Sequence, residues 1–227
     1  NALKTGLPYM LTGTGLATGQ GLESGGFVKS RPDLETPDLQ FHFITALMYD
    51  HTRRKADRHG YMAHVCQLRP ESRGYISIKS ADPLVAPLIQ PNYLEAEEDR
   101  RALREGVKIA RALFATKAFD AYRGPELMPG AHVTKDDQID AFIRKTAETI
   151  YHPVGSARMG HDKDAVVDPQ LKVHGIEGLR VVDASVMPSL VSGSSNAPTI
   201  MIAEKASDMM LGKAAPVPEH IHVAEDK

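Results

Sequence analysis

Apolar and polar side chains alternate along two short stretches in the first half of the chain. Residues 39–43 alternate with a period of two, which places three apolar residues on one face of a strand and His42 on the other. Residues 74–80 alternate in the same way and are followed by an Asp-Pro pair, which ends a strand. These patterns predict an antiparallel sheet with one face covered. His42 faces a polar cavity or, equally well from the pattern alone, is a half-buried strand histidine bonded to a neighbour.

Apolar side chains at three- and four-residue spacing predict two helices in the middle of the chain. The first lies between Glu95 and Phe119, with Glu and Arg on its polar face. Its apolar stripe consists of Leu103, Val107, Ala110 and Phe114. The second begins near Thr134, which supplies an N-cap hydroxyl, and ends near residues 151–153, because proline disfavours a helical residue before it. Its stripe consists of Ile139, Phe142, Ile143 and Thr146.

The last third of the chain has a different pattern. Residues 179–183 form a β-branched run that ends in Asp183, and Asn196 opens a helix with one apolar side. That side consists of Ile202, Ala206 and Met209. A strand, a loop and a helix in this order are typical of an α/β cofactor domain. Residues 213–227 are predicted to form a loose tail, in which the His220 and His222 pair is an accident of a solvent-exposed segment rather than a metal site.

The segment from Leu11 to Phe27 is rich in glycine and invites comparison with a dinucleotide-binding turn. Residues 13–18 have Thr, and residues 19–24 have Ser, where the third glycine of Gly-x-Gly-x-x-Gly belongs, and neither stretch follows a convincing strand. We therefore predict that this segment is a loop.

Composition and charge exclude several classes of protein. The 27 Lys and Arg residues nearly balance the 29 Asp and Glu residues, so the chain has no basic excess that would favour nucleic acid as a partner. The single cysteine, Cys66, fits a reducing compartment and offers no zinc site. The chain starts at Asn1 without an initiator Met or the layout of a signal peptide, and we expect it to be a piece of something longer.

Three segments carry the strongest functional signal. They are residues 151–160 (YHPVGSARMG), 178–188 (GLRVVDASVMP) and 195–205 (SNAPTIMIAEK). In order and spacing they closely resemble the C-terminal half of the glucose-methanol-choline (GMC) oxidoreductases, flavoproteins that oxidise alcohols. The resemblance is greatest to choline dehydrogenase-like and aliphatic alcohol dehydrogenase members, and it extends upstream to residues 69–74 and 23–27. In this family the glycine-rich turn for the FAD pyrophosphate lies in the N-terminal half, so the resemblance implies that this chain is a fragment lacking most of the FAD site.

The resemblance implies a division of the chain into three parts. Residues 1–150 correspond to a substrate-binding domain, an antiparallel sheet with flanking helices that includes part of the boundary with the FAD domain. Residues 151–212 correspond to the catalytic histidine loop together with the C-terminal strand and helix of a Rossmann-like FAD domain, and residues 213–227 to the tail. The fold class is therefore α+β to α/β.

His152 and Asn196 are the candidate catalytic residues. Free imidazole titrates near neutral pH and can take a hydroxyl proton, although a lone histidine is more often structural. The resemblance implies that His152 accepts the alcohol proton as hydride leaves the substrate carbon for the flavin N5. It also implies that Asn196 donates a hydrogen bond to the substrate oxygen beside the flavin; the residue pattern alone favours a helix N-cap there.

The resemblance assigns further residues to the cofactor and to the substrate cavity. Cofactor contacts are expected from Asp183, Ala184, Asn196, Ala197, Pro198 and Thr199. Asp183 alternatively caps the segment that follows it. The substrate cavity is expected to include Glu23, His42, Ile150 and Tyr151, with Glu23 suited to a cationic headgroup. No metal is expected.

The expected partners are a small alcohol, FAD in the complete protein, and an electron acceptor that is a quinone, a dye-like carrier or oxygen. A missing N-terminal half and a second copy of the chain are further expected partners. The expected localisation is cytoplasmic, with attachment to a membrane surface as the alternative for the complete protein. Two competing interpretations remain. One is an isolated, colourless substrate-binding module without a functional FAD site; the other, a Ser/His hydrolase, is disfavoured because no Gly-x-Ser-x-Gly segment is present.

Overall fold

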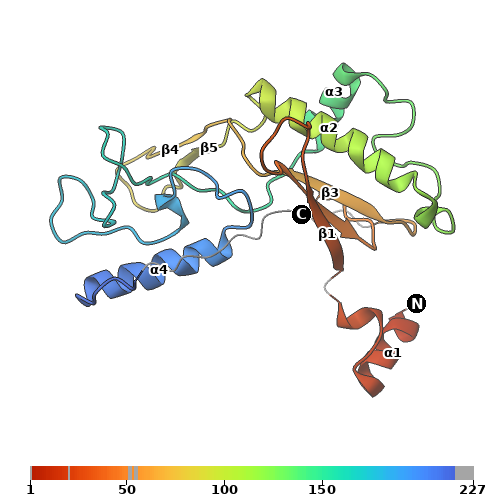
Figure 1. Ribbon diagram of the computed structural model, residues 1–227, viewed down its shortest axis with the longest axis horizontal. Coiled ribbons are helices and arrows are strands. Elements are labelled where there is room, and N and C mark those ends of the chain that lie inside the picture. The colour runs from red at the N-terminus through yellow and green to blue at the C-terminus, as the bar shows by residue number, and fades with distance from the viewer. Residues whose placement is uncertain (1, 20, 51–52, 54–55, 218–227) are drawn as a thin grey trace. The chain divides into compact units, whose positions relative to one another are not determined.

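A computed structural model describes residues 2–19, 21–50, 53 and 56–217 and divides the chain into two compact units, Asn1–Tyr151 and His152–Lys227 (Figure 1). The first unit contains the helices α1 (Ala2–Thr12), α2 (Glu97–Phe114) and α3 (Asp136–Thr146), the short 3-10 helices η1 (Leu16–Thr18) and η3 (Lys117–Phe119), and the strands β1 (Leu22–Val28), β2 (Leu39–Ile44), β3 (Met62–Gln67), β4 (Tyr75–Ser77) and β5 (Leu88–Gln90). The second contains the 3-10 helix η4 (Ala184–Val186) and the helix α4 (Asn196–Met210). That the first unit is a substrate-binding domain and the second is part of an FAD-binding domain stays a prediction.

The core of the first unit is built on a three-stranded antiparallel sheet with the order β1-β2-β3. The predicted strand at residues 39–43 is confirmed as the central strand β2. Leu39 and Phe41 are buried on one face, whereas His42 is half-buried and pairs with Gly25 on one side and with His64 on the other. The alternation therefore holds from Leu39 to His42, whereas Phe43 is only half-buried and Ile44, on the same side as His42, is 2% exposed.

The loop prediction for the glycine-rich segment is wrong for its second half, which forms β1. A Cβ atom on Gly25 would lie 2.4 Å from the carbonyl oxygen of Phe41 on β2. Glycine thus serves here to let two strands approach closely, a use that weakens the ordinary sequence signal of a strand. The first half contains the end of α1 and the short helix η1, so neither near-match to Gly-x-Gly-x-x-Gly lies between a strand and a helix.

Helix α2 confirms the first predicted helix but buries a face shifted from the predicted stripe. Figure 1 shows α2 lying along the sheet, where Ala102 is completely buried and packs near Leu39 and Phe41. A Cβ atom on Gly106 would lie 2.6 Å from Cγ1 of Val65 on β3. Small residues therefore bring the helix backbone close to the sheet, and the predicted Leu103 is only half-buried at the edge of this contact.

Buried Asp99 fixes the start of α2. Its carboxylate is 3% exposed and accepts hydrogen bonds from the backbone N–H groups of Glu71 and Ser72, at 2.8 and 2.9 Å, and from the Ser72 hydroxyl. Burial alone would raise the pKa of Asp99, but these hydrogen bonds outweigh it and hold the pKa below its usual range. The helix is thereby tied to the segment that precedes β4.

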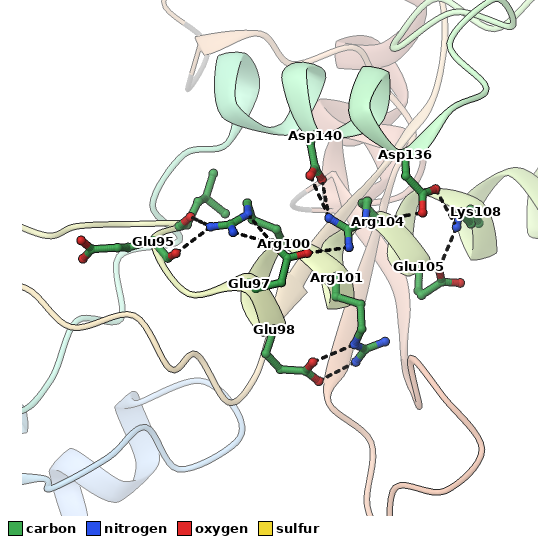
Figure 2. Close-up of polar contacts among 11 residues, drawn as sticks. Glu95, Glu97, Glu98, Arg100, Arg101, Arg104, Glu105, Lys108, Asp136 and Asp140 are labelled. Carbon is green, nitrogen blue, oxygen red and sulfur yellow. Dashed lines mark hydrogen bonds and ion pairs between the residues drawn. The ribbon is translucent and has the colours of Figure 1, made fainter.

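Ion pairs join α2 to α3, as Figure 2 shows. Arg104 on α2 donates to both carboxylate oxygens of Asp140 on α3, at 2.9 and 2.8 Å, and to Glu97 at 2.8 Å. These hydrogen bonds raise the pKa of the Arg104 guanidinium. Lys108 bridges Glu105 and Asp136 in the same way, at 2.8 and 3.0 Å. The polar face of α2 is therefore bonded to α3 at these residues and is not simply exposed to solvent.

Helix α3 differs from its prediction at both ends. It begins at Asp136, and the amide oxygen of Gln138 accepts from the backbone N–H groups of Thr134 and Lys135, at 3.0 and 3.2 Å, so the Thr134 hydroxyl is not the N-cap. It ends at Thr146, because the backbone at Ala147 is already extended. The proline at position 153 is thus not what stops this helix. Its buried side chains, Ile139 and Ile143, belong to the predicted stripe.

The predicted strand at residues 74–80 is shorter than expected and belongs to a separate sheet. Only β4 is regular, and it pairs antiparallel with β5 alone. All three β4 residues are exposed, so the prediction of a covered face is wrong for this strand. A two-residue alternation predicts which side chains share a face but does not determine whether another layer packs on it.

The second unit buries a core between loops and one helix. Its buried residues are Val167, Leu171, Val186, Met187, Ile202 and Ala206. The prediction of α4, including its buried side, is confirmed at Ile202 and Ala206. The predicted strand at residues 179–183 is wrong, since residues 152–217 contain isolated bridges in place of regular strands. The run is held by Val173 N–H to Leu179 O, at 3.0 Å, and Val181 N–H to Leu171 O, at 3.1 Å.

Among the described residues, no helix combines the length and the apolar character that crossing a bilayer requires.

Candidate active site

The three segments that carry the sequence signal come together around the core of the second unit. The N–H of Ala157 donates to Ser185 O at 3.0 Å, and the N–H of Met159 donates to Val186 O at 2.8 Å, which ties the histidine segment to η4. Helix α4 packs on the same core through Ile202. A single cluster of apolar side chains thus positions all three segments.

His152 is half-buried, and its ring is held by the residue that precedes α4. Nδ1 lies 2.8 Å from the hydroxyl oxygen of Ser195 and accepts from the Ser195 backbone N–H at 3.3 Å. The sequence analysis missed Ser195 as a partner of His152, because the two residues are 43 positions apart and a serine before a helix is an ordinary feature.

The backbone around His152 adopts conformations that few residues tolerate. Tyr151 has φ of 63°, in the left-handed region, which is unusual for a bulky side chain. Gly155 has φ of 88°, and a Cβ atom there would lie 3.3 Å from Met187 O. Backbone of this kind persists where the surroundings fix it, and it occurs preferentially at functional sites.

Asn196 is the first residue of α4 rather than its N-cap, so the capping interpretation of Asn196 is wrong. The N-cap is Ser195, and within the described part of the chain its side chain makes no capping hydrogen bond to the helix. Asn196 and Ala197 are exposed. The positive end of the helix dipole and the amide of Asn196 therefore face outward from the core of the unit, where they can interact with an anion or a polar ligand.

The remaining predicted cofactor residues lie in two places: Asp183 and Ala184 at the start of η4, and Pro198 and Thr199 in the first turn of α4. Asp183 is exposed and accepts from Ser185 N–H at 2.7 Å, so it caps η4, which confirms the alternative role given for it in the sequence analysis. Ala184 is the first residue of η4. Pro198 lacks an N–H group, and the Thr199 hydroxyl donates to Ser195 O at 2.6 Å. Capping by one carboxylate oxygen leaves the other oxygen of Asp183 able to accept from a ligand.

The predicted cavity residues belong to the first unit. Glu23 lies on β1 at the shift in register between Leu22 and Ser24, across from the strand that carries His42. Ile150 and Tyr151, at the end of this unit, are 41% and 64% exposed. The structure brings the strands of Glu23 and His42 side by side, and it brings His152 next to Ser195 and Asn196 within the second unit.

Other reactive groups do not add a second site. The described residues contain no cluster of three or more His, Cys, Asp or Glu side chains that could hold a metal, and the His220 and His222 pair lies outside the described residues. Burial raises the pKa of the Cys66 thiol, which disfavours a reactive thiolate. Arg158 donates to Asp162 at 2.9 Å, and this hydrogen bond lowers the pKa of Asp162.

Comparisons with known proteins relate this chain to one family of oxidoreductases. A family model described as GMC oxidoreductase matches residues 70–203. The chain is 51% identical over 205 residues to an alcohol dehydrogenase [acceptor] of Pseudomonas putida, covering 90% of this chain and 37% of that protein. It is 46% identical over 212 residues to an oxygen-dependent choline dehydrogenase of Yersinia pestis, covering 93% of this chain and 37% of that protein.

A solved structure supports the same relationship. A variant of Aspergillus oryzae formate oxidase, studied for modification of its FAD, superposes with a TM-score of 0.78 at 25% identity and covers 92% of this chain and 41% of its own. The chain therefore belongs to the GMC oxidoreductase family. It spans a little over a third of the length of the relatives it matches.

Proposed function

We propose that this chain is the C-terminal part of an FAD-dependent alcohol dehydrogenase or oxidase that converts a primary alcohol, choline-like or aliphatic, to an aldehyde. The observation that carries the proposal is the placement of the His152 ring, whose Nδ1 lies 2.8 Å from the hydroxyl of Ser195, the residue that precedes the helix of Asn196. A titratable base and a neutral amide donor thereby lie within a few residues of each other at one helix end. A base can take the hydroxyl proton, and an amide donor can stabilise the negative charge that develops on the oxygen.

The residues present fit one side of a flavin site. The uncapped positive end of α4 suits a ring system that becomes anionic, and Asn196, Ala197, Pro198 and Thr199 would lie along it. Asp183 and Ala184, at the start of η4, would contact the chain of the cofactor. When bound, FAD supplies the acceptor for the hydride. The residues that would bind the pyrophosphate are expected in another part of the complete protein.

His152 and Asn196 would divide the work on the alcohol. His152 would take the hydroxyl proton on its imidazole ring, which the 2.8 Å contact with the Ser195 hydroxyl holds in one orientation. The side-chain amide of Asn196 donates to the substrate oxygen and stabilises the negative charge that develops there. A half-buried ring held by a hydrogen bond is oriented in advance, which lowers the entropy cost of reaching the transition state.

The proposed substrate classes and partners are based on the names of the relatives and on the family resemblance. The P. putida relative is named for alcohols and the Y. pestis relative for choline, so both classes remain candidates. Glu23, His42, Ile150 and Tyr151 would line the cavity, with Glu23 favouring a cationic headgroup. The remaining expectations stand as part of the proposal: a quinone, a dye-like carrier or oxygen as acceptor, the missing N-terminal half, a homo-oligomer, and a cytoplasmic or membrane-peripheral location.

The test uses the complete flavoprotein that contains this sequence. His152→Ala should lower the rate of flavin reduction by an alcohol roughly 10²- to 10⁴-fold with FAD still bound, because the base is lost. Stopped-flow absorbance of the flavin measures this rate. His161→Ala is the matched control, since His161 is an exposed histidine of the same unit. Near-normal reduction in the His152 variant would overturn the assignment.

The second candidate is an isolated substrate-binding module without a functional FAD site. The observation that favours it is the coverage of 37% of the relatives' length. Titration of the purified 227-residue chain with FAD, followed by flavin fluorescence, separates the two candidates within the same experiment. A colourless chain that binds no FAD, together with an active complete protein, is the result that the first proposal expects.

A further inference from the structure

Ser195 presents two donor groups to the same nitrogen of His152. Its hydroxyl oxygen lies 2.8 Å from Nδ1, and its backbone N–H donates to Nδ1 at 3.3 Å. A backbone N–H can only donate, so this contact requires the lone pair of the ring on Nδ1. With the lone pair there, the hydroxyl contact is satisfied only when the hydroxyl also donates. The neutral ring therefore carries its proton on Nε2, and Nδ1 is its basic nitrogen.

The basic nitrogen of His152 is covered by Ser195, which is 9% exposed. Nε2 already carries a proton and cannot accept another. A proton can then reach Nδ1 by two routes. One runs through the Ser195 hydroxyl and keeps the ring in the orientation that the structure shows. The other needs a rotation of the ring, which breaks both contacts with Ser195.

The Ser195 hydroxyl is able to pass a proton on. A hydroxyl has one hydrogen to donate and two lone pairs, so donation to Nδ1 leaves acceptor capacity on the oxygen. Within the described part of the chain the helix does not use this capacity, because Ser195 makes no capping hydrogen bond with its side chain. Asn196, the proposed donor to the alcohol oxygen, is the next residue and is exposed. An alcohol held by Asn196 would thus bind beside the residue whose hydroxyl contacts Nδ1.

We infer that Ser195 is a catalytic residue that relays the alcohol proton to Nδ1 of His152. The inference rests on the proposed function of His152 as the base. In the relay, the alcohol O–H bond breaks and its proton moves to the Ser195 oxygen, while the Ser195 O–H bond breaks and that proton moves to Nδ1. Ser195 ends as a hydroxyl, as it began, and the ring becomes an imidazolium. The electron pair left on the substrate oxygen forms the carbonyl bond as the hydride leaves the carbon.

The kinetic test uses the complete flavoprotein and stopped-flow measurement of flavin reduction by an alcohol. Ser195→Ala removes the relay and should lower the rate roughly 10²-fold with FAD still bound, as expected for the loss of base catalysis. Ser195→Thr retains a hydroxyl and should recover most of the rate. Ser194→Ala is the matched control, because Ser194 is the exposed neighbour and should leave the rate unchanged. An unchanged or faster rate in Ser195→Ala would favour rotation of the ring and would overturn the relay.

A solvent isotope measurement separates a relay from a merely structural role of Ser195. Two protons move in the relay as the hydride leaves, so the wild-type rate should fall along a curve as the deuterium fraction of the solvent increases. A single proton in flight would give a straight line. A straight line, or a rate that does not depend on deuterium, would overturn the relay even if Ser195→Ala is slow.

The state of the ring can be tested without turnover. Spectra of the complete flavoprotein labelled with ¹⁵N-histidine report which ring nitrogen carries the proton, and His152→Gln identifies the signal. The neutral wild-type ring should be protonated at Nε2, and protonation at Nδ1 would overturn the relay. If His152→Ala lowers the rate of flavin reduction but Ser195→Ala does not, the base is retained and the relay alone is refuted. If His152→Ala leaves the rate intact, the proposed function fails and the relay fails with it.

Discussion

The two units of the chain stabilise their cores in different ways. In the first unit, a helix packs on a three-stranded sheet, and the core residues Leu39 and Ala102 are fully buried between them. In the second unit, one long helix packs on loops that are joined by single backbone hydrogen bonds and isolated bridges. The candidate proton chemistry is found in the second unit, on loops positioned by a small core, which is a common arrangement in enzymes.

The two units also differ in the length of the side chains that make their main polar contacts. The first unit carries a network of ion pairs between α2 and α3 that uses the long side chains of Arg104 and Lys108 at a partly exposed surface. The second unit also has an ion pair, between Arg158 and Asp162, but the contacts at its candidate site use short side chains, as in those of His152 with Ser195 and of Asp183 with Ser185. Short side chains have few rotamers and therefore hold an imidazole or a loop in one orientation at a low entropic cost.

The largest effect that we expect concerns the first unit and Asp99. Asp99→Ala removes a buried acceptor from the N–H groups of Glu71 and Ser72 and should lower the free energy of unfolding by about 3 kcal/mol. Urea unfolding measures this change, and hydrogen exchange should accelerate at the start of α2 more than in the second unit. Equal acceleration in both units would mean that the two cores are not distinct.

The same carboxylate gives the first unit a dependence on acid. The folded pKa of Asp99 is lower than the unfolded value of about 3.9, so the stabilisation is complete above the unfolded pKa and is lost as the pH falls through the folded pKa. In Asp99→Asn this part of the acid dependence should be absent. Unfolding curves at a series of pH values from neutral to acid test this sign.

The second prediction applies the corresponding change to the core of the second unit. Ile202→Ala removes a side chain that is 8% exposed among Val167 and Val186, and we expect a loss of about 2 to 3 kcal/mol. Amide exchange of Met159, which bonds to η4, should accelerate. Ile200→Ala is the control, because Ile200 is 55% exposed on the same helix. A similar loss in the control would mean that the buried side of α4 does not stabilise this unit.

The smallest effect on stability, and the one that best separates chemistry from packing, concerns Asn196. Asn196→Asp places a carboxylate in the first turn of α4, where the helix dipole should stabilise the protein by about 0.3 to 1 kcal/mol. The same charge opposes a developing alkoxide, so flavin reduction in the complete enzyme should slow about tenfold or more. Thermal unfolding and stopped-flow absorbance measure the two effects. Lower stability with an unchanged rate would leave Asn196 a structural residue.

Local patterns predicted the elements whose signals lie within a few residues. The alternation around His42 predicted β2, and the helical spacing predicted α2 and α4. Three segments taken together, at residues 151–160, 178–188 and 195–205, indicated the GMC family, which the comparisons confirm. These features are local in sequence, because side-chain periodicity follows directly from the geometry of a strand or a helix.

Contacts between distant segments decided the rest. β1 is a strand because Gly25 can approach Phe41, and α2 buries Gly106 and Ala102 because the sheet admits only small residues there. The run at residues 179–183 contains the β-branched Val181 and Val182, but among residues 152–217 it has isolated bridges and no neighbouring strand.

The partner of His152 illustrates this division most clearly. The sequence by itself identified the histidine and the helix of Asn196, but the pairing of His152 with Ser195 joins positions that are 43 residues apart. A hydroxyl that precedes a helix has two uses, capping the helix or bonding a distant side chain, and both are compatible with the same sequence pattern. The packing of the histidine segment against η4 and α4 brings the ring within reach of the hydroxyl, so tertiary structure selects the second use.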